Sequence, residues 1–452
     1  AIVMAPLIVA VYTPSDYPKN EFDLAVAFTR LCLPQIFFYG IYTMFSQVLN
    51  TRGKFGAPMF APIANNIVAI STFLLFIYFA GTAAAAEGNL SSGQVWLLGL
   101  GTTLGVVAQA LILIPVLIRA GYMWRPRFDL RGHGLGKAGK LAVWTIGLVL
   151  VNQLTYIVIT RLAAQANVNA AAQEVVAAGL TTYQKAHLVF MLPHSVITVS
   201  IVTALLPALS RVAHAGKLSQ VGRDISGALR LVSFFIIPVT AILFVVGISV
   251  AVLLFGFGAA TTQQAELMGQ VISIFMLGMI PFTLFYVLLR GYYSLEDTKS
   301  PFFITVIFSL VLLVLLVPFF NNFTGGGTQI SFMAACYSGS YWVGLLIAWI
   351  VLARKLGGLQ SGTTIASITR MGVAGLFSVF AMLLAQTQIN NAIFGSSESV
   401  DLTDKMSVLI RLTVVVCVGI ISYLVTAWIF RVPEITLAYR VIRKKLGSKV
   451  KS

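Results

Sequence analysis

Charged side chains are scarce in this sequence: Asp, Glu, Lys and Arg make up 10% of its 452 residues, whereas apolar residues make up 58%. Soluble globular domains carry about 25% charged residues. The mean hydropathy of +0.92 is also far above that of soluble domains. This composition excludes a soluble enzyme or binding domain, and it predicts an all-α polytopic membrane protein.

Acidic residues are the rarer charged class, with 14 Asp and Glu against 30 Lys and Arg. The apolar stretches contain almost no carboxylates, which argues against carboxylate proton relays and against exporters that bind cationic drugs. A membrane transferase is disfavoured too, because a DDxxD-type motif for Mg²⁺ and diphosphate is missing. We therefore expect a transporter rather than an enzyme, with no catalytic residues, metal site or cofactor.

Cysteine is also rare, and Cys32, Cys336 and Cys417 have neither disulfide nor metal-ligand spacing. All three lie in apolar stretches. We therefore expect them to be buried apolar side chains.

Long apolar runs recur along the whole chain. A bilayer core takes about 20 residues of helix, and on this criterion we predict eleven complete spans. Residues 1–12 are apolar but too short to cross, and they are expected to be the outer end of a helix that begins upstream. The predicted spans are residues 24–49, 58–81, 95–118, 138–160, 180–206, 227–255, 269–292, 302–320, 329–353, 366–388 and 406–430.

Basic residues alternate between the two sides of these spans. Of the 30 Lys and Arg, 24 fall in every second loop or in the segment 431–452, whereas Lys19 and Lys405 alone lie in loops on the other side. By the positive-inside rule the first side is cytoplasmic, and so is the C-terminus. The net charge of +16 therefore indicates topology rather than a nucleic-acid partner.

An internal repeat emerges when the chain is shifted by 243 residues against itself. The shift places NTRGKFGAPMF (50–60) on YSLEDTKSPFF (293–303), and PLIVAVYT (6–13) on SVAVLLFG (249–256). Both charged turns lie on the same side, so the repeat is parallel, a plan in which transporters bind substrate between the halves. Two helices precede the aligned region in the second half. We therefore expect two helices and most of a third before residue 1, with about 14 spans in the intact protein.

The repeat and the spans together predict a domain order. An incomplete N-terminal lobe is followed by a basic, aromatic linker lying on the membrane surface. A C-terminal lobe, two additional helices and a basic cytoplasmic tail come next. These parts are residues 1–118, 119–137, 138–354, 355–430 and 431–452, respectively.

A few cations lie inside the predicted spans. A charge in the bilayer core costs a few kcal/mol, so such residues usually face a hydrated path or a partner. Arg30 has either a functional role, as a cavity residue that binds the substrate, or a helix-packing role. The turn cations Arg52 and Lys54 are topology signals in part, and Asn65 and Asn66 are predicted to have a structural role beside Pro62.

Arg161 and Lys185 lie in consecutive predicted helices joined by a short polar loop, residues 162–179. We expect these two cations to approach each other, with His187 as a third group that can be protonated. Together with Asn152 and Gln153 they would bind an anionic substrate. The alternative is that they contact lipid headgroups at the interface.

Three segments resemble a known family. LPQIFFYGIYTMFSQVLNTRGKFGAPMFAPIANNIV (33–68) resembles the fourth and fifth helices of the MurJ/MviN lipid II flippases. RGYYSLEDTKSP (290–301) resembles the family's FYS-x-x-D-T-x-x-P turn, and MLPHSVITVSIVTALLPALSR (191–211) resembles its eighth helix. The residues that carry the two turn motifs are Arg30, Pro34, Leu49, Asn50, Phe55, Pro58, Pro62 and Asn66 in the first, and Tyr293, Ser294, Asp297, Thr298 and Pro301 in the second.

The resemblance implies the multidrug/oligosaccharidyl-lipid/polysaccharide exporter fold. In this fold two six-helix lobes form a V around a cationic cavity, and two further helices form a lipid groove. It also implies a function: alternating access that moves lipid II, the undecaprenyl-diphosphate-linked peptidoglycan precursor, to the outer leaflet of the bacterial plasma membrane. Lipid II and membrane lipids are the implied partners, with cell-wall synthesis proteins as further candidates.

Two positions connect the site residues to the family. Gln153 falls at the glutamine of the family's seventh helix, and His187 stands where many relatives have an arginine. We hypothesise that a protonated His187 replaces that cation. Two alternatives stay open: export of another polyprenyl-diphosphate-linked oligosaccharide, and a non-transporting membrane scaffold for cell-wall synthesis.

Overall fold

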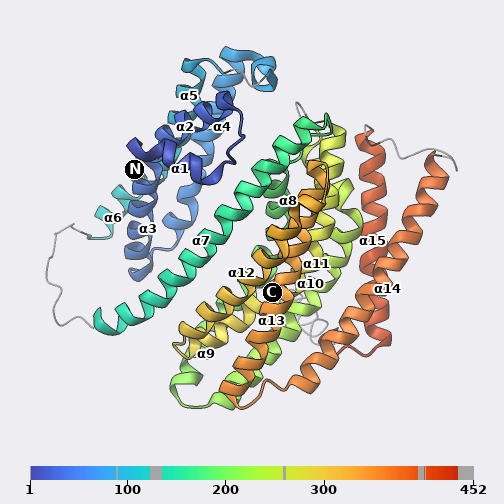
Figure 1. Cartoon of the computed structure of the whole chain (residues 1–452). Helices are drawn as coiled ribbons and strands as arrows, with labels where there is room; N and C mark the ends of the chain where they lie inside the picture. Colours follow the sequence, from blue (N-terminus) through green and yellow to red (C-terminus); the bar gives the residue numbers. More distant parts are fainter. Residues whose placement is uncertain are drawn as a thin grey trace, which may run out of the picture. The chain divides into compact units, whose positions relative to one another are not determined.

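The computed structural model of the chain describes residues 2–87, 90–122, 135–257, 261–394, 402 and 404–435. These residues form helices and no strands, and eleven helical segments among them are long and apolar enough to cross a membrane (Figure 1). The all-α fold class is therefore confirmed. The chain divides into two compact units, Ala1–His133 and Gly134–Ser452, which are treated separately below. The predicted lobe boundaries stay predictions.

Unit 1 is built around α5, which packs against α2, α3 and α4. α5 begins at a capping box in which Ser91 and Gln94 satisfy each other's backbone amides. The elements of unit 1 are η1 (Ile2–Met4), α1 (Ala5–Tyr12), α2 (Lys19–Cys32), α3 (Gln35–Thr51), α4 (Gly56–Glu87), α5 (Ser92–Leu111) and α6 (Ile114–Arg119).

The predicted span 24–49 consists of two helices, because the chain breaks between α2 and α3 at Pro34. Proline has no amide proton and cannot continue the helical hydrogen bonds. Side chains compensate: the Thr103 hydroxyl donates to the carbonyl of Leu31 at 2.7 Å, and Gln35 Nε2 donates to the hydroxyls of Thr102 at 3.3 Å and Thr103 at 3.1 Å. The break is therefore held in place by α5.

Asn65 lies one turn past Pro62 in α4, and it packs directly against α5. A Cβ added at Gly105 would collide with the side-chain oxygen of Asn65, so glycine is what lets the two helices approach here. This contact fits the predicted structural role of Asn65. Asn66, in contrast, is exposed in unit 1.

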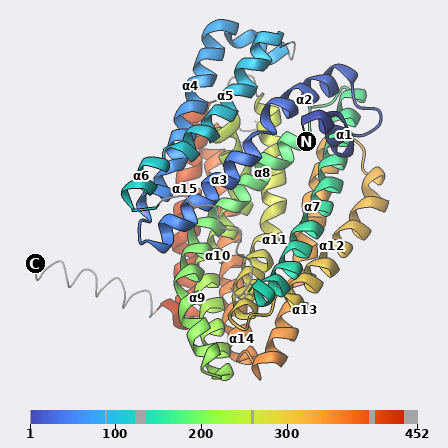
Figure 2. The same cartoon turned by 90° about the vertical axis from the view of Figure 1, so that its left-hand side faces the viewer.

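Unit 2 is organised around the long helices α10 and α11, with α13 and α8 packed on α11. Figure 1 shows α14 and α15 as a pair at one edge of this unit, and α14 also contacts α10. Figure 2 shows α7 beside α12. The elements are α7 (Leu135–Ala172), α8 (Leu180–Pro193), η2 (His194–Thr198), α9 (Val199–His214), α10 (Leu218–Phe255), α11 (Thr262–Ser294), α12 (Lys299–Phe319), η3 (Phe320–Asn322), α13 (Gly326–Leu356), α14 (Ser361–Phe394) and α15 (Lys405–Ile429).

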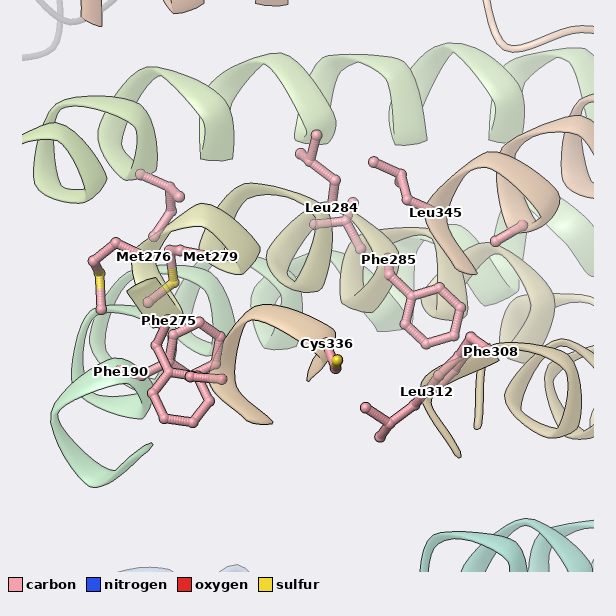
Figure 3. Close-up of a cluster of buried hydrophobic side chains, with 14 of the residues drawn as sticks. Phe190, Phe275, Met276, Met279, Leu284, Phe285, Phe308, Leu312, Cys336 and Leu345 are labelled. Atoms are coloured by element: carbon pink, nitrogen blue, oxygen red, sulfur yellow. The ribbon is translucent and has the colours of Figure 1, made fainter. Parts of the chain in front are cut away.

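The core of unit 2 lies between α8, α11, α12 and α13, where aromatic and sulfur-containing side chains interdigitate (Figure 3). Phe190 and Phe275 are fully buried there, and Cys336 is 6% exposed. The expectation that all three cysteines are buried is wrong, because Cys32 is half-buried and Cys417 is exposed. An apolar stretch in a span can face the surroundings of the protein as well as its core.

The predicted loop 162–179 is wrong over most of its length, because α7 continues to Ala172. Its last turns are rich in alanine, the best helix former. Asn169 fixes this extension by donating from Nδ2 to Gln329 Oε1 of α13 at 3.0 Å. Arg161 therefore lies well inside α7 rather than at its outer end.

The two charged turns predicted to be repeats have the same backbone hydrogen bonds. Lys54 N donates to Leu49 O, and 243 residues later Asp297 N donates to Tyr292 O. This hydrogen bond, from an amide to the carbonyl five residues earlier, is typical of the Schellman motif. In this motif the residue before the donor has the left-handed backbone conformation. Gly53 with φ of 70° takes that position in the first turn, and Glu296 with φ of 55° takes it in the second. The local geometry thus follows the predicted repeat although the residues differ.

Candidate substrate pocket

Unit 2 contains a pocket of about 500 Å³ between α7, α8, α12 and α13. Its polar groups are amides, hydroxyls and one imidazole, and its apolar groups are mostly aromatic. The lining residues are Asn152, Gln153, Thr155, Tyr156, Ile159, Tyr183, Gln184, His187, Phe308, Ser309, Leu312, Tyr337, Ser340 and Tyr341.

α7 contributes one face of its helix to the pocket. Asn152, Tyr156 and Ile159 share this face because residues three and four apart are neighbours on a helix. Asn152 Nδ2 donates to the carbonyl of Leu148 one turn earlier, at 3.1 Å, which fixes the orientation of the amide. The α7 wall therefore presents carboxamide and phenol groups in fixed positions.

α8 contributes Tyr183, Gln184 and His187. Gln184 Nε2 donates to Tyr156 Oη at 2.9 Å and so connects the α8 wall to the α7 wall. Both of these side chains are exposed in unit 2, so they lie at the open part of the pocket. The amide of Gln184 and the hydroxyl of Tyr156 are therefore polar groups with which a bound ligand can form hydrogen bonds.

His187 lies in a cage of aromatic rings. Its Nε2 is 3.2 Å from Tyr337 Oη, which comes from α13. The imidazole stacks parallel to Tyr183 with centroids 6.3 Å apart, and it meets Phe275 edge to face at 5.6 Å. These contacts fix the ring on the pocket wall, with one nitrogen committed to a phenol.

The pocket has no fixed charge: among the residues that the structure describes, no Asp, Glu, Lys or Arg lines it. Amides and hydroxyls bind sugar hydroxyls and acetamido or peptide groups, and tyrosine rings stack on the apolar faces of sugars. Such a surface cannot compensate the two charges of a diphosphate. The described residues also hold no cluster of three or more His, Cys, Asp or Glu that would suit a metal ion.

The structure brings together three of the predicted site residues, Asn152, Gln153 and His187. Arg161 does not line this pocket. It comes nine residues after Asn152, or about two and a half turns, and so lies opposite Asn152 around α7. Lys185 points to α10, where its Nζ lies 5.5 Å from the Phe255 ring centre. Substrate binding by these two cations therefore stays a prediction.

Arg30 belongs to unit 1, in the last turn of α2, and its side chain is exposed. Its predicted role in a cavity stays a prediction, because the pocket described here is formed by unit 2 alone.

The first turn motif has structural contacts. The Tyr42 hydroxyl donates to the carbonyl of Pro58 at 2.9 Å. Arg52 donates to the carbonyl of Ala120 and lies over the ring of Tyr122, with 5.6 Å between guanidinium and ring centre. These contacts connect the turn to the end of α6. Of the other motif residues, Phe55 is exposed, Asn50 and Pro62 are partly buried, and no partner is described for their side chains.

The second turn motif ends α11 and begins α12. Asp297 Oδ1 accepts a hydrogen bond from the Ser300 amide at 3.0 Å, and Asp297 Oδ2 lies 2.8 Å from Lys355 Nζ of α13. Burial raises the pKa of Asp297, but Lys355 and the Ser300 amide outweigh it, so that the pKa lies below its usual value. Ser294 donates to the carbonyl of Gly291 at 2.8 Å.

The remaining residues of this motif also pack in the turn. The Tyr293 ring lies 5.9 Å from the Arg290 guanidinium, and Pro301 is buried in the first turn of α12, where a missing amide proton costs nothing. Thr298 is the residue before α12 begins. The motif therefore joins the ends of three helices.

Sequence analysis missed the aromatic part of the pocket. Tyr337 and Tyr341 from α13 lie with ring centres 5.0 Å apart, and Tyr183 completes the wall from α8. The spacing of Tyr337 and Tyr341, four residues apart with Ser340 beside them, places polar tips on one helix face and was visible in the sequence.

Three comparisons with known proteins agree with one another. The family model for lipid II flippase MurJ matches residues 1–401. A "Probable lipid II flippase MurJ" of Buchnera aphidicola subsp. Baizongia pistaciae is 25% identical over 393 residues, covering 86% of this chain and 72% of that protein. One of Vibrio cholerae serotype O1 is 26% identical over 372 residues, covering 80% of this chain and 65% of that protein.

A solved structure, "Lipid II flippase MurJ, inward closed conformation", matches with a TM-score of 0.69 and 18% identity. The match covers 96% of this chain and 80% of that one, and it shows the fold. The chain spans 72% and 65% of the lengths of the two curated relatives above. The family predicted from the turn motifs is thus confirmed, as is the prediction of a transporter rather than an enzyme. The chain belongs to the lipid II flippase MurJ family of membrane transporters.

Proposed function

We propose that this protein flips lipid II across the bacterial plasma membrane, and that its α7–α8–α12–α13 pocket binds the disaccharide, which is the uncharged part of the headgroup. The observation that carries this proposal is the lining of the pocket. Amide groups of Asn152, Gln153 and Gln184 and the rings of Tyr337 and Tyr341 surround a space without fixed charge.

The charged part of the substrate needs a different surface. A diphosphate is transferred into a membrane protein only where cations compensate its charge. Arg161 and Lys185 are our candidates for this role, since both lie in the helices that also form the pocket. Arg161 is exposed on α7, and it would then hold the diphosphate. The pocket-lining residues of the same helix would hold the sugars.

The orientation follows from the positive-inside rule: the basic loops and the C-terminus face the cytoplasm. In alternating access, the headgroup site opens first to the cytoplasmic leaflet, where the substrate is made, and then to the outer leaflet, where it is used. Cell-wall synthesis proteins on either side of the membrane are proposed as partners for the same reason.

The test compares two ligands on the purified full chain: lipid II, and undecaprenyl diphosphate, which lacks the disaccharide-peptide. Gln184→Leu removes one hydrogen-bonding group from the pocket and should weaken lipid II binding about fivefold. It should leave undecaprenyl diphosphate binding unchanged. Gln388→Leu in α14, whose side chain is exposed and lines no described pocket, is the matched control.

Substitution of a cation should affect both ligands rather than lipid II alone. Arg161→Gln should weaken binding of both ligands, because both carry the diphosphate. Complementation of a flippase-depleted bacterium, with lipid II in the inner leaflet as readout, then connects binding to transport. If Gln184→Leu weakened both ligands equally, the assignment of the pocket to the neutral part of the headgroup would be refuted.

A further inference from the structure

A second cavity, of about 540 Å³, lies in unit 2 where α10, α14 and the segment after α15 meet. It shares no residue with the substrate pocket. Its charged and hydroxyl groups include Arg230 of α10, Ser367 and Arg370 of α14, and Glu434. Nothing in the proposed transport path uses these residues.

Glu434 organises one side of this cavity. Its Oε1 lies 3.3 Å from Arg230 Nε, and its Oε2 accepts a hydrogen bond from Ser367 Oγ at 3.0 Å. Both carboxylate oxygens are thus occupied, and Arg230 is held against the wall. Arg370, one turn after Ser367, is exposed and has no ion pair with any residue that the structure describes. With two arginines and one carboxylate, the described lining of the cavity carries a net charge of +1.

The cavity lies where polar chain gives way to apolar chain. On α10 the apolar run begins with Leu231, directly after Arg230, and on α14 it begins with Met371, directly after Arg370. α15 ends its apolar run at Ile429, five residues before Glu434. All three segments therefore meet the membrane boundary at this level, on the side that the positive-inside rule assigns to the cytoplasm.

We propose that this cavity binds the phosphodiester headgroup of an anionic phospholipid of the cytoplasmic leaflet. Basic pockets between transmembrane helices on this side suit such headgroups. Arg370 would donate to the phosphate oxygens in the two-pronged geometry of a guanidinium. The positive end of α14, which begins at Ser361, adds further attraction.

The rest of the lining fits a lipid rather than a free ion. Leu231, Ala366 and Pro433 form the apolar part of the wall, which can accept the glycerol and the first methylene groups of the acyl chains. A net charge of +1 is neutralised by one phosphodiester, which carries a single negative charge. A bound lipid would connect α10, α14 and the segment after α15.

The test measures lipid binding to the purified full chain in detergent micelles by native mass spectrometry, with phosphatidylglycerol and phosphatidylcholine as probes. Phosphatidylglycerol should bind preferentially, and Arg370→Gln should lower its binding about fivefold. The matched control is Arg354→Gln, which removes an exposed arginine near the cytoplasmic end of α13, outside the cavity. Phosphatidylglycerol binding to Arg354→Gln should equal its binding to the wild type.

Glu434→Gln provides a variant of opposite sign. Removing the carboxylate raises the charge of the cavity, so phosphatidylglycerol binding should increase. The thermal unfolding midpoint of each variant shows whether it is folded. If Glu434→Gln is unstable, Arg370→Gln decides alone, because Arg370 has no described ion partner to lose.

Three results would overturn the proposal. The first is equal binding of the two lipids, and the second is equal loss in Arg370→Gln and Arg354→Gln. The third is competition by millimolar inorganic phosphate that removes phosphatidylglycerol, because the ligand would then be free phosphate rather than a lipid.

Discussion

The ion pair between Asp297 and Lys355 is predicted to hold together the end of α11, the start of α12 and the end of α13. The Asp297 side chain is 15% exposed and the Lys355 side chain 42% exposed, so the pair is shielded on one side only. Asp297→Asn removes the charge but keeps an oxygen for the Ser300 amide. Lys355→Met removes the cation with little change in length.

The magnitude follows from the geometry. At 2.8 Å and an effective dielectric constant of about 20, Coulomb's law gives an attraction of about 6 kcal/mol before desolvation. Desolvation of Asp297 and the exposure of Lys355 offset most of this attraction. We expect a coupling free energy of about 1 to 2 kcal/mol between the two substitutions, which lies above that of an exposed pair.

Acid should remove this stabilisation. The pKa of Asp297 lies below its usual value because Lys355 and the Ser300 amide outweigh the effect of burial. A carboxylate with a lowered pKa in the folded state stabilises the fold above its unfolded pKa of about 4. The contribution is lost as pH falls through the lower, folded-state pKa. The stability difference between wild type and Asp297→Asn should therefore be constant near neutral pH and shrink in acid.

The assay is a double-mutant cycle on the purified protein in detergent micelles, with unfolding followed by denaturant titration at neutral and acidic pH. Lys299, two residues from Asp297, lies over the Trp144 ring at 5.6 Å and provides the control. Its cycle with Asp297 should give a coupling near zero. A coupling for Lys355 no larger than that for Lys299 would refute the reasoning, as would a coupling unchanged in acid.

Two glycine pairs extend the predictions to backbone conformation and helix packing. Gly53→Ala should lower the free energy of unfolding by about 1 kcal/mol, because φ is 70° at this position. Gly56→Ala should not lower it, because Gly56 starts a helix and a Cβ there would meet open space. Gly278→Ala should cost about 1 to 3 kcal/mol, since its Cβ would lie 2.7 Å from the Cα of Ser338 across the α11–α13 contact. Gly339→Ala, which meets nothing within 4 Å, should be neutral or stabilising. Denaturant titration in micelles measures all four, and equal effects within a pair would contradict the prediction.

Sequence alone predicted the spans because each depends on a local property, the length of an apolar run. It failed where helix and apolar run end at different places. α7 continues to Ala172 through an alanine-rich segment that is helical without being apolar enough to count as a span. Pro34 marks the opposite case, where one apolar run contains two helices because proline interrupts the helical hydrogen bonds. A side chain from α5 then satisfies the carbonyl of Leu31.

The candidate site was predicted in part. Asn152, Gln153 and His187 were found because polar groups in an apolar run are conspicuous. The tyrosines were not, since an aromatic residue in a span is equally typical of a core or a lipid-facing surface. The helical period alone places Arg161 nearly opposite Asn152 on α7, and this separation could be read from the sequence. The contact of Lys185 with Phe255 was not predictable, because it depends on how the folded chain places the end of α10 beside this side chain of α8.

The uncharged lining of the substrate pocket has a physical consequence for a transporter of a two-part headgroup. A cavity that opens alternately to the two sides of a membrane must release its ligand as well as bind it. Buried charge pairs are costly to separate. Hydrogen bonds to neutral groups contribute only about 1 kcal/mol each and exchange readily with water. In the proposed function, a neutral pocket for the sugars, with the cations for the diphosphate outside it, therefore gives recognition through many weak contacts and keeps the strong charge interaction out of the pocket.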